Sequence, residues 1–149
     1  MAEYLANAVQ TVNVGDPIIF TASIPCNKGY IYHEDETGIF TLRGIVNNPC
    51  ARFARYQVTF NGNIAVPTGG TVGPIAVAIA VSGEPRLTSR AIVTPAAVEE
   101  YNNVTSTAII TVPAGCCFNM SIEAVSAEPG AATTAIEVQN ANLVITRIA

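Results

Sequence analysis

The chain has 149 residues, of which 50% are hydrophobic and only 12% charged, about half the charged share of an ordinary soluble domain. A single domain of this length buries enough core to fold without a metal ion or a disulfide. The net charge of −4 and the scattered positions of the seven basic residues argue against nonspecific binding to nucleic acid, which depends on phosphate neutralisation by Lys and Arg.

The N-terminal segment, MAEYLANAVQ, lacks the basic region and the long apolar core of a signal peptide. No apolar run in the chain reaches the length of a membrane span. We therefore expect a protein that folds in a cytoplasm and has no membrane partner. Residues 1–149 are predicted to form one domain, in which about residues 1–8 are a short leader.

Short strands separated by turn residues are predicted in the first third of the chain. Apolar and polar residues alternate over Val9–Val14, which predicts a first strand, and Ile18–Ile24, between two prolines, predicts a second. A polar loop is expected over Asn27–Gly38, followed by a short strand over Ile39–Leu42. This spacing is typical of an antiparallel all-β domain.

The bulkiest strand is predicted over Ala51–Asn63 and forms the centre of the expected core. Its large side chains, Tyr56, Val58 and Phe60, alternate with polar residues, so one face of the strand is apolar and the other polar. The sequence Asn61-Gly62-Asn63 tolerates positive φ angles and is expected to end the strand in a turn.

The middle of the chain contains one segment with an ambiguous pattern. Ile75–Val81 is almost continuously apolar, as in a buried helix or a buried strand. Its β-branched residues alternate with alanine, and this period of two favours a strand. A returning strand is predicted over Arg86–Thr94, and Pro95–Tyr101 is the only segment expected to form a helical turn.

The last third of the chain predicts a hairpin and two closing strands. Val104–Val112 and Cys116–Val125 lie on either side of the tight turn Pro113-Ala114-Gly115. Ala135–Val138 and Ala141–Ile148 then end the chain. A total of about eight to ten short strands indicates an antiparallel β-sandwich or jelly roll.

The four cysteines, Cys26, Cys50, Cys116 and Cys117, do not form a metal-binding pattern. There is no CxxC motif, and neighbours on a strand point to opposite faces, so Cys116 and Cys117 cannot both bind one tetrahedral ion. Buried free thiols are the expected state, because folding in a cytoplasm disfavours disulfides. A Cys26–Cys50 bridge is the alternative.

Candidate catalytic and metal-binding residues are few. His33 is the only histidine and precedes Glu34-Asp35-Glu36, which we interpret as a solvated acidic loop, with a weak calcium site as the alternative. No serine lies in a GxSxG motif, and a Cys–His pair would need Cys116 or Cys117 from the apolar hairpin. Glu99-Glu100 is interpreted as a solvated pair. We predict a protein that is not an enzyme, without catalytic residues, cofactor or metal.

Several segments resemble the trimeric jelly roll of the tumour necrosis factor and complement globular-head superfamily. Tyr56–Phe60 resembles the family's Y-x-V-x-F strand, and Ala78–Pro85 resembles a strand that ends in a V-N-G hairpin, with Ser82 in place of Asn. Thr107–Met120 and Asn142–Ile148 resemble its T-V-P-A-G hairpin and its closing strand. The style is closest to bacterial and bacteriophage members, such as tip domains of spore-surface proteins.

The resemblance implies a compact homotrimer in which one sheet of each subunit faces the threefold axis. It places Tyr56, Val58 and Phe60 near the subunit contacts; the other interpretation is that these are ordinary core residues. A trimer would also explain the low charge, because subunit contacts would cover part of the surface. A simple alanine-rich composition is the alternative explanation.

No Gly-X-Y collagen stalk precedes the predicted domain, so a bacteriophage capsid decoration protein or fibre head fits better than a stalk-borne tip. Such a virion protein assembles in the host cytoplasm and contacts capsid or other particle subunits. The alternative is a receptor- or carbohydrate-binding tip on a phage fibre or on a bacterial cell or spore surface. That tip would use Asn27–Gly38, with Tyr30 and Tyr32 as aromatic contacts.

Overall fold

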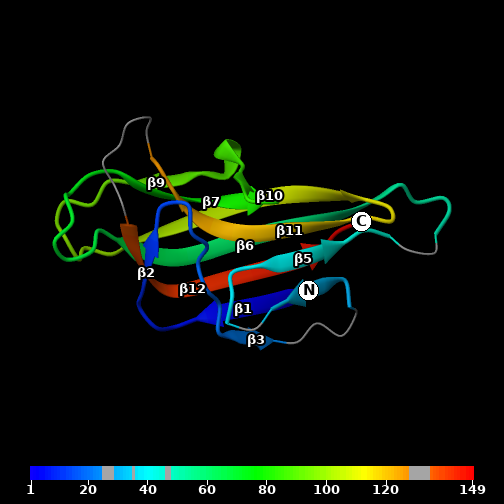
Figure 1. Cartoon of the computed structure of the whole chain (residues 1–149), viewed down its shortest axis with the longest axis horizontal. Helices are drawn as coiled ribbons and strands as arrows, with labels where there is room; N and C mark the ends of the chain where they lie inside the picture. The colour runs from blue at the N-terminus through cyan, green and yellow to red at the C-terminus, as the bar shows by residue number, and fades with distance from the viewer. Residues whose placement is uncertain (25–28, 35, 46–47, 128–134) are drawn as a thin grey trace.

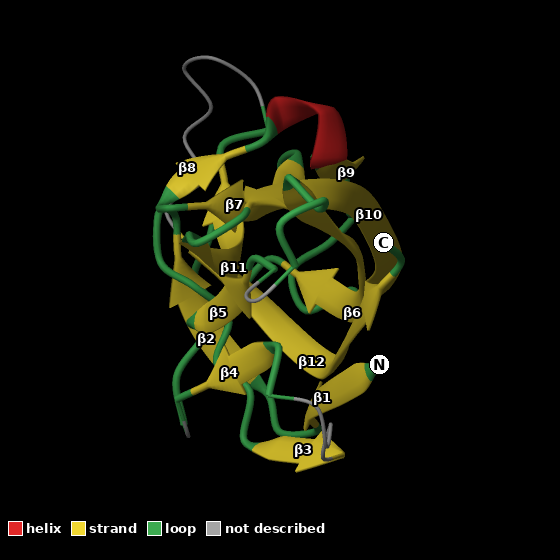
Figure 2. Cartoon of the chain, turned by 90° about the vertical axis from the view of Figure 1, so that its right-hand side faces the viewer, coloured by secondary structure: helices red, strands yellow, loops and turns green. Residues whose placement is uncertain are grey.

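Two antiparallel β-sheets pack face to face in the computed structural model, which describes residues 1–24, 29–34, 36–45, 48–127 and 135–149. Figure 2, viewed from the end of the molecule that carries both termini, shows the two layers on either side of the core. No α-helix occurs in the described part of the chain. The predicted antiparallel β-sandwich is therefore confirmed.

Sheet A contains most of the long strands and both ends of the chain (Figure 1). Its order is β10 (Asn102–Pro113), β6 (Phe53–Ala65), β12 (Ala135–Arg147), β1 (Ala2–Ala6) and β3 (Ala22–Ile24), with β2 (Gln10–Asn13) also paired to β12.

Sheet B is built around the apolar strand that the sequence left ambiguous, which is indeed a strand. Its order is β4 (Ile31–His33), β5 (Phe40–Arg43), β11 (Cys117–Val125), β7 (Ile75–Val81) and β8 (Glu84–Pro85), with β9 (Ala91–Val93) also paired to β7.

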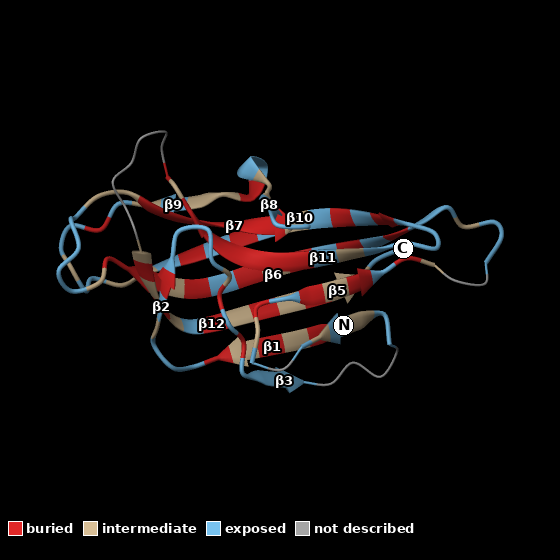
Figure 3. Ribbon diagram, viewed as in Figure 1, coloured by how far each residue is buried: buried red, intermediate tan, exposed pale blue. Residues whose placement is uncertain are grey.

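The core lies between the sheets. Every second residue of the long strands of sheet A is buried in it, whereas residues 75–80 of β7 are all buried (Figure 3). On β6 the side chains of Tyr56, Val58 and Phe60 are fully buried, as are Ile75 and Ile79 on β7. Burying such large apolar side chains contributes about 1.5–3 kcal/mol each relative to leaving them exposed. Large apolar side chains at every second position give each of these strands one bulky apolar side, and the two sheets pack together to bury these sides.

The turn predicted at Asn61-Gly62-Asn63 is wrong, because β6 continues through these residues to Ala65. Both neighbours, β10 and β12, stay paired with β6 across this point. A Cβ atom at Gly62 would lie 2.8 Å from Cζ of Phe60. The glycine therefore provides room for a core ring inside a strand and does not end the strand.

The leader predicted for about residues 1–8 is also wrong over Ala2–Ala6, which form β1 inside sheet A. Ala2 pairs with Ile145 of β12 on one side, and Glu3 pairs with Ile24 of β3 on the other. The N-terminal residues are thus part of the sheet. The small alanines at alternate positions explain why this strand had a weak apolar pattern.

Two further predictions in the middle of the chain need correction. The strand expected over Arg86–Thr94 is interrupted by a 3₁₀ turn, η1 (Leu87–Ser89), because the Ser89 hydroxyl bonds to the Arg86 carbonyl at 2.6 Å. The helical turn expected over Pro95–Tyr101 does not form. Within it, Glu99 adopts a left-handed φ of 63°, which is incompatible with a helix.

The remaining differences concern strand lengths. Only Ala22–Ile24 of the predicted Ile18–Ile24 strand is in a sheet ladder, and the loop expected over Asn27–Gly38 contains β4. The two closing strands form one strand, β12, with a register shift between Gln139 and Asn142. Among the described residues, no helix has the length and apolar composition that crossing a bilayer requires.

Candidate functional site

The outward side of sheet A is a regular surface of alternating residues that is not packed against the chain's own core. We call the outward side chains of β1, β6, β10 and β12 the A face. They are Glu3, Leu5, Phe53, Arg55, Gln57, Thr59, Asn61, Asn63, Asn103, Thr105, Thr107, Ile109, Thr111, Glu137, Gln139, Asn142, Val144 and Thr146. Three of them, Glu3, Arg55 and Glu137, carry charge, so the face is nearly uncharged.

Polar side chains in the middle of the A face bind one another across neighbouring strands. The Asn103 amide donates to Oδ1 of Asn61 at 2.8 Å and to Oδ1 of Asn63 at 3.2 Å. The hydroxyls of Thr59 and Thr107 lie 3.2 Å apart. Because these groups already have partners on the face itself, covering them with another protein leaves fewer polar atoms unsatisfied.

The two carboxylates on the A face are also engaged by neighbours. Glu3 accepts a hydrogen bond of 2.6 Å from the Asn142 amide, and Glu137 accepts one of 2.8 Å from the Tyr101 hydroxyl. Burial, followed by this hydrogen bond to Glu137, raises the pKa of Tyr101 to about 12. The phenol therefore stays protonated and remains a donor at any physiological pH.

One end of the A face is apolar. Ile109 and Phe53 of the A face are 54% and 40% exposed there, and Ile148, which directly follows β12, is 47% exposed. Ile109 pairs with Gln57 of β6, and the Ile148 amide donates to the Arg55 carbonyl at 2.9 Å, so these residues come from three adjacent strands. The Arg55 guanidinium stacks 4.7 Å from the centre of the Phe53 ring. This mixture of apolar, aromatic and arginine side chains is the composition that protein interfaces favour.

Tyr56, Val58 and Phe60, the predicted interface residues, lie on the opposite side of the same strand. All three are fully buried between the sheets, so they have no surface of their own to lose on assembly. Their contribution to subunit contacts stays a prediction. The residues of β6 that have surface to offer are the alternating ones, such as Arg55 and Gln57.

His33 belongs to an aromatic cluster at the edge of the core, whereas Glu34 and Glu36 are exposed, in agreement with the solvated acidic loop expected there. Its ring stacks on Phe40 at 4.4 Å and meets the Tyr4 ring edge-on at 5.0 Å. Nε2 of His33 lies 2.9 Å from the Thr37 carbonyl oxygen. Asp35 lies outside the described residues, so the weak calcium site stays a prediction.

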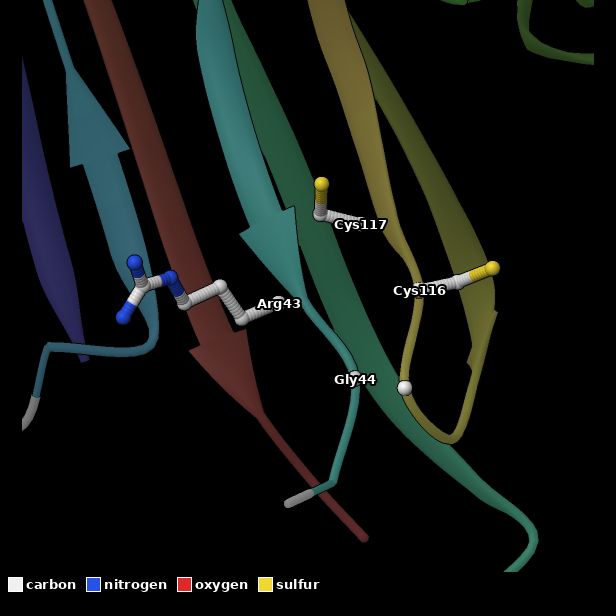
Figure 4. Close-up of a pocket in the computed structure, with 5 residues that line it drawn as sticks. Arg43, Gly44, Cys116 and Cys117 are labelled. Atoms are coloured by element: carbon white, nitrogen blue, oxygen red, sulfur yellow. The ribbon is translucent and has the colours of Figure 1, made fainter.

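Cys50, Cys116 and Cys117 carry free, exposed thiols, so the prediction that they are buried is wrong. Cys26 lies outside the described residues. Cys116 and Cys117 line a cavity of about 320 Å³ together with Arg43, Gly44 and Gly115. Figure 4 shows their sulfur atoms pointing in different directions, which does not suit a shared metal ion.

Tyr30 and Tyr32, the aromatic residues proposed for a binding tip, do not line either of two cavities in the described part of the chain. The Arg147 guanidinium covers the Tyr30 ring at 4.2 Å, whereas Tyr32 is 63% exposed. Neither the cavity beside the cysteines nor a second one of about 150 Å³, lined by Ala6, Ala8, Gln10, Ile19 and Thr21, contains a tyrosine.

Glu99 and Glu100 are both exposed, in agreement with their interpretation as solvated residues. The Glu99 carboxylate nevertheless accepts hydrogen bonds from the Thr68 hydroxyl at 2.7 Å and from its amide at 3.1 Å. The bond from the Thr68 hydroxyl is the main cause that lowers the pKa of Glu99. Glu99 thus anchors one loop to another, a role that the sequence alone did not indicate.

No protein-family model matches the chain, and no curated protein matches its sequence. Solved structures do match. The globular domain of zebrafish complement 1qA is similar with a TM-score of 0.57 at 15% identity, over 96% of this chain and 94% of that domain. The Eiger TNF of S. frugiperda is similar with a TM-score of 0.64 at 9% identity, over 100% of this chain and 92% of that one.

These matches define the fold: the chain is a TNF-like jelly roll. The fold predicted from the short motifs is confirmed. At 15% and 9% identity the likeness concerns architecture alone, so the bacterial or bacteriophage character of the chain stays a prediction.

Proposed function

We propose that this chain is a non-enzymatic structural protein that assembles as a homotrimer through its A face. The main support is the contrast between a fully packed core and an outward face on the same strands that carries only three charged residues, Glu3, Arg55 and Glu137. A sheet face that met only water would normally carry more charge.

The surface that such an interface needs is a small share of this chain's surface. A stable contact takes about 800 Å² from each partner, roughly a tenth of the 7754 Å² surface of this chain. The apolar end of the A face supplies about 25 cal/mol for each Å² removed from water, before the cost of association. The paired amides and hydroxyls in its middle lower the desolvation penalty of the polar part.

The trimeric state is favoured by the resemblance to trimeric jelly rolls. In that arrangement one sheet of each subunit faces the threefold axis, and sheet A has the open face that this requires. The low charge of the whole chain, 12%, agrees with a surface that is partly covered by other subunits.

Two matched substitutions test the A face. Ile109→Glu places a carboxylate on the apolar end of the A face, whereas Ile92→Glu places one on β9 of sheet B, where Ile92 is similarly exposed at 48%. An unpaired charge buried in an interface costs several kcal/mol. We expect sedimentation velocity to show monomers for the first variant and trimers for the second. Trimers that survive Ile109→Glu, or dissociate only with Ile92→Glu, would contradict the proposal.

We further propose that the trimer is a component of a bacteriophage particle, as a capsid decoration protein or fibre head assembled in the host cytoplasm. The support is the motif resemblance of Tyr56–Phe60 and Asn142–Ile148 to bacterial and phage members, together with the low charge. Mass spectrometry of gradient-purified particles from cells that encode the chain tests this role. We expect the chain to sediment with the particles; recovery only in the unassembled protein fraction would overturn it.

The alternative, a receptor- or carbohydrate-binding tip, has less support. Sugars stack on exposed aromatic faces, and the ring of Tyr30 is already covered by Arg147. Tyr32 alone of this pair presents an open ring. The structural role is therefore preferred.

A further inference from the structure

Arginine side chains gather at one end of the sandwich, which we call the basic end. Outside the A face, Arg43, Arg52 and Arg147 lie there and make up three of the seven basic residues of the chain. The Gly44 amide bonds to Cys116, and the Ala114 amide bonds to Arg52, so Arg43 and Arg52 flank the turn between β10 and β11. Both termini are at this end (Figure 1).

Carboxylates gather at the opposite end, which we call the acidic end. Glu99 and Glu100 lie in the loop whose Glu99 amide bonds to the Val66 carbonyl, just beyond β6. Asp16 lies at the same end, where its carbonyl accepts a hydrogen bond from the Ala124 amide near the end of β11. The 13 residues of β6 separate the two ends by roughly 40 Å, at 3.3 Å per residue.

The two signs lie mostly at opposite ends. The exception is Arg90, whose guanidinium donates to the Ser126 carbonyl just beyond β11, at the acidic end. Among the described residues, the arginine side chains contact aromatic rings or main-chain oxygens. Arg55 stacks on Phe53, Arg147 stacks on Tyr30 and donates from Nε to the main-chain oxygen of Ala149 at 3.2 Å, and Arg86 and Arg90 donate to carbonyls. Stacking on a ring fixes a guanidinium while leaving most of its N–H donors free. Arg43 and Arg52 are exposed and have no side-chain hydrogen bond within the described part of the chain.

We propose that the basic end of one molecule docks on the acidic end of a second copy, so that the molecules stack end to end. The argument is charge complementarity: each copy presents unpaired guanidiniums at one end and exposed carboxylates at the other. Arginine forms bidentate hydrogen bonds with carboxylates, and this geometry constrains the relative orientation of the two molecules as well as attracting them. Because the two surfaces differ, the contact is heterologous and extends into columns.

This inference rests on the proposed trimer, although a monomer could stack in the same way. A threefold axis along the strands of sheet A leaves both ends of every subunit free. A trimer then presents three basic ends on one side and three acidic ends on the other, and three weak contacts act together. The stacking is electrostatic, so salt weakens it: the Debye length falls from about 30 Å at 0.01 M salt to about 3 Å at 1 M.

Two charge-reversed variants test the stacking without an external ligand. Arg43→Glu/Arg52→Glu leaves Arg147 against two glutamates at the basic end, so that both ends are acidic. Asp16→Arg/Glu100→Arg leaves Glu99 against two arginines at the acidic end, which becomes basic; all four positions are exposed and lie outside the A face. We expect species heavier than the trimer for the unmodified protein in sedimentation velocity at about 0.02 M salt, and their loss at about 0.5 M salt. Each variant alone should lose them, and mixing the two variants should restore them.

The masses separate this inference from the proposed trimer. Stacks that grow in steps of three chains support both, and stacks that grow in steps of one chain support the stacking while contradicting the trimer. A protein that stays at the trimer mass at low salt and high concentration overturns the stacking and leaves the trimer intact. Heavy species that persist in either variant alone, or that do not return on mixing, overturn it as well.

Discussion

The two sides of sheet A are made by alternate residues of the same strands, yet they differ in burial and in polarity. On β6, Tyr56 and Phe60 are fully buried in an apolar core, whereas Gln57 and Asn61 between and beside them face outward on a nearly uncharged surface. The inward side holds the monomer together by burial, and the outward side is available for a partner. Substitutions on the two sides should therefore affect different quantities, the free energy of unfolding on one side and that of association on the other.

Removing a ring from the inward side should have the largest effect. Phe60→Ala deletes a fully buried ring, and we expect the free energy of unfolding to fall by about 3–5 kcal/mol in urea denaturation. Phe53→Ala on the outward side of the same strand is the matched control, because Phe53 is 40% exposed. It should weaken the trimer and leave the unfolding of the monomer nearly unchanged. If Phe60→Ala and Phe53→Ala lowered the free energy of unfolding equally, the proposed difference between the two sides would be contradicted.

A methyl group added inside β6 should have an intermediate effect. Gly62→Ala places a Cβ atom 2.8 Å from Cζ of Phe60, which forces the ring to move and costs about 1–3 kcal/mol of stability. Gly73→Ala is the control, because no atom lies within 4 Å of its Cβ position. Thermal unfolding of both variants distinguishes them; a neutral Gly62→Ala would show that the ring is not confined as described.

A carboxylate on sheet B should have the smallest effect, and one that depends on pH. Burial, and then the charge of Asp16, raises the pKa of Glu123, although a hydrogen bond from Ser121 partly offsets this. A raised pKa means that the folded state binds the proton more tightly, so stability is full below the unfolded value of about 4.3 and falls as pH rises through the folded value.

Glu123→Gln should accordingly raise the melting temperature at neutral pH. The gain should shrink as pH falls toward about 4, where the natural side chain is also neutral. Ser121→Ala is the control, since it removes the hydrogen bond but keeps the titrating group. A gain that is the same at every pH would show that packing, and not ionisation, is responsible.

The sequence predicted the strands whose patterns are local. The period of two identified β6 with its buried side and identified β7 as a strand, although β7 is buried on both sides. The short motifs indicated the TNF-like fold. The turn expected at Asn61-Gly62-Asn63 failed because the need for glycine comes from the ring of Phe60, a packing effect that local turn preferences do not contain. The strand Ala2–Ala6 was missed because two alanines carry its buried side.

The candidate site was harder to predict from the sequence than the fold. The interface prediction fell on Tyr56, Val58 and Phe60 because apolar residues are the usual interface signal, but these side chains are taken up by the core. The alternating polar residues of Asn103–Thr111 were visible in the sequence. Their hydrogen bonds to β6, such as that from Asn103 to Asn61, depend on pairing between segments some forty residues apart, which no local pattern specifies.

The central claim is that the A face is covered by other copies of this chain, and the mass of the unmodified protein in solution tests it most directly. Light scattering at about 0.5 M salt, where end-to-end stacking is screened, should give three times the 15.5 kDa of one chain. The mass should be the same with and without reductant, because the predicted contacts are not covalent. A mass of 15.5 kDa, or a trimer that reductant dissociates, would contradict the account.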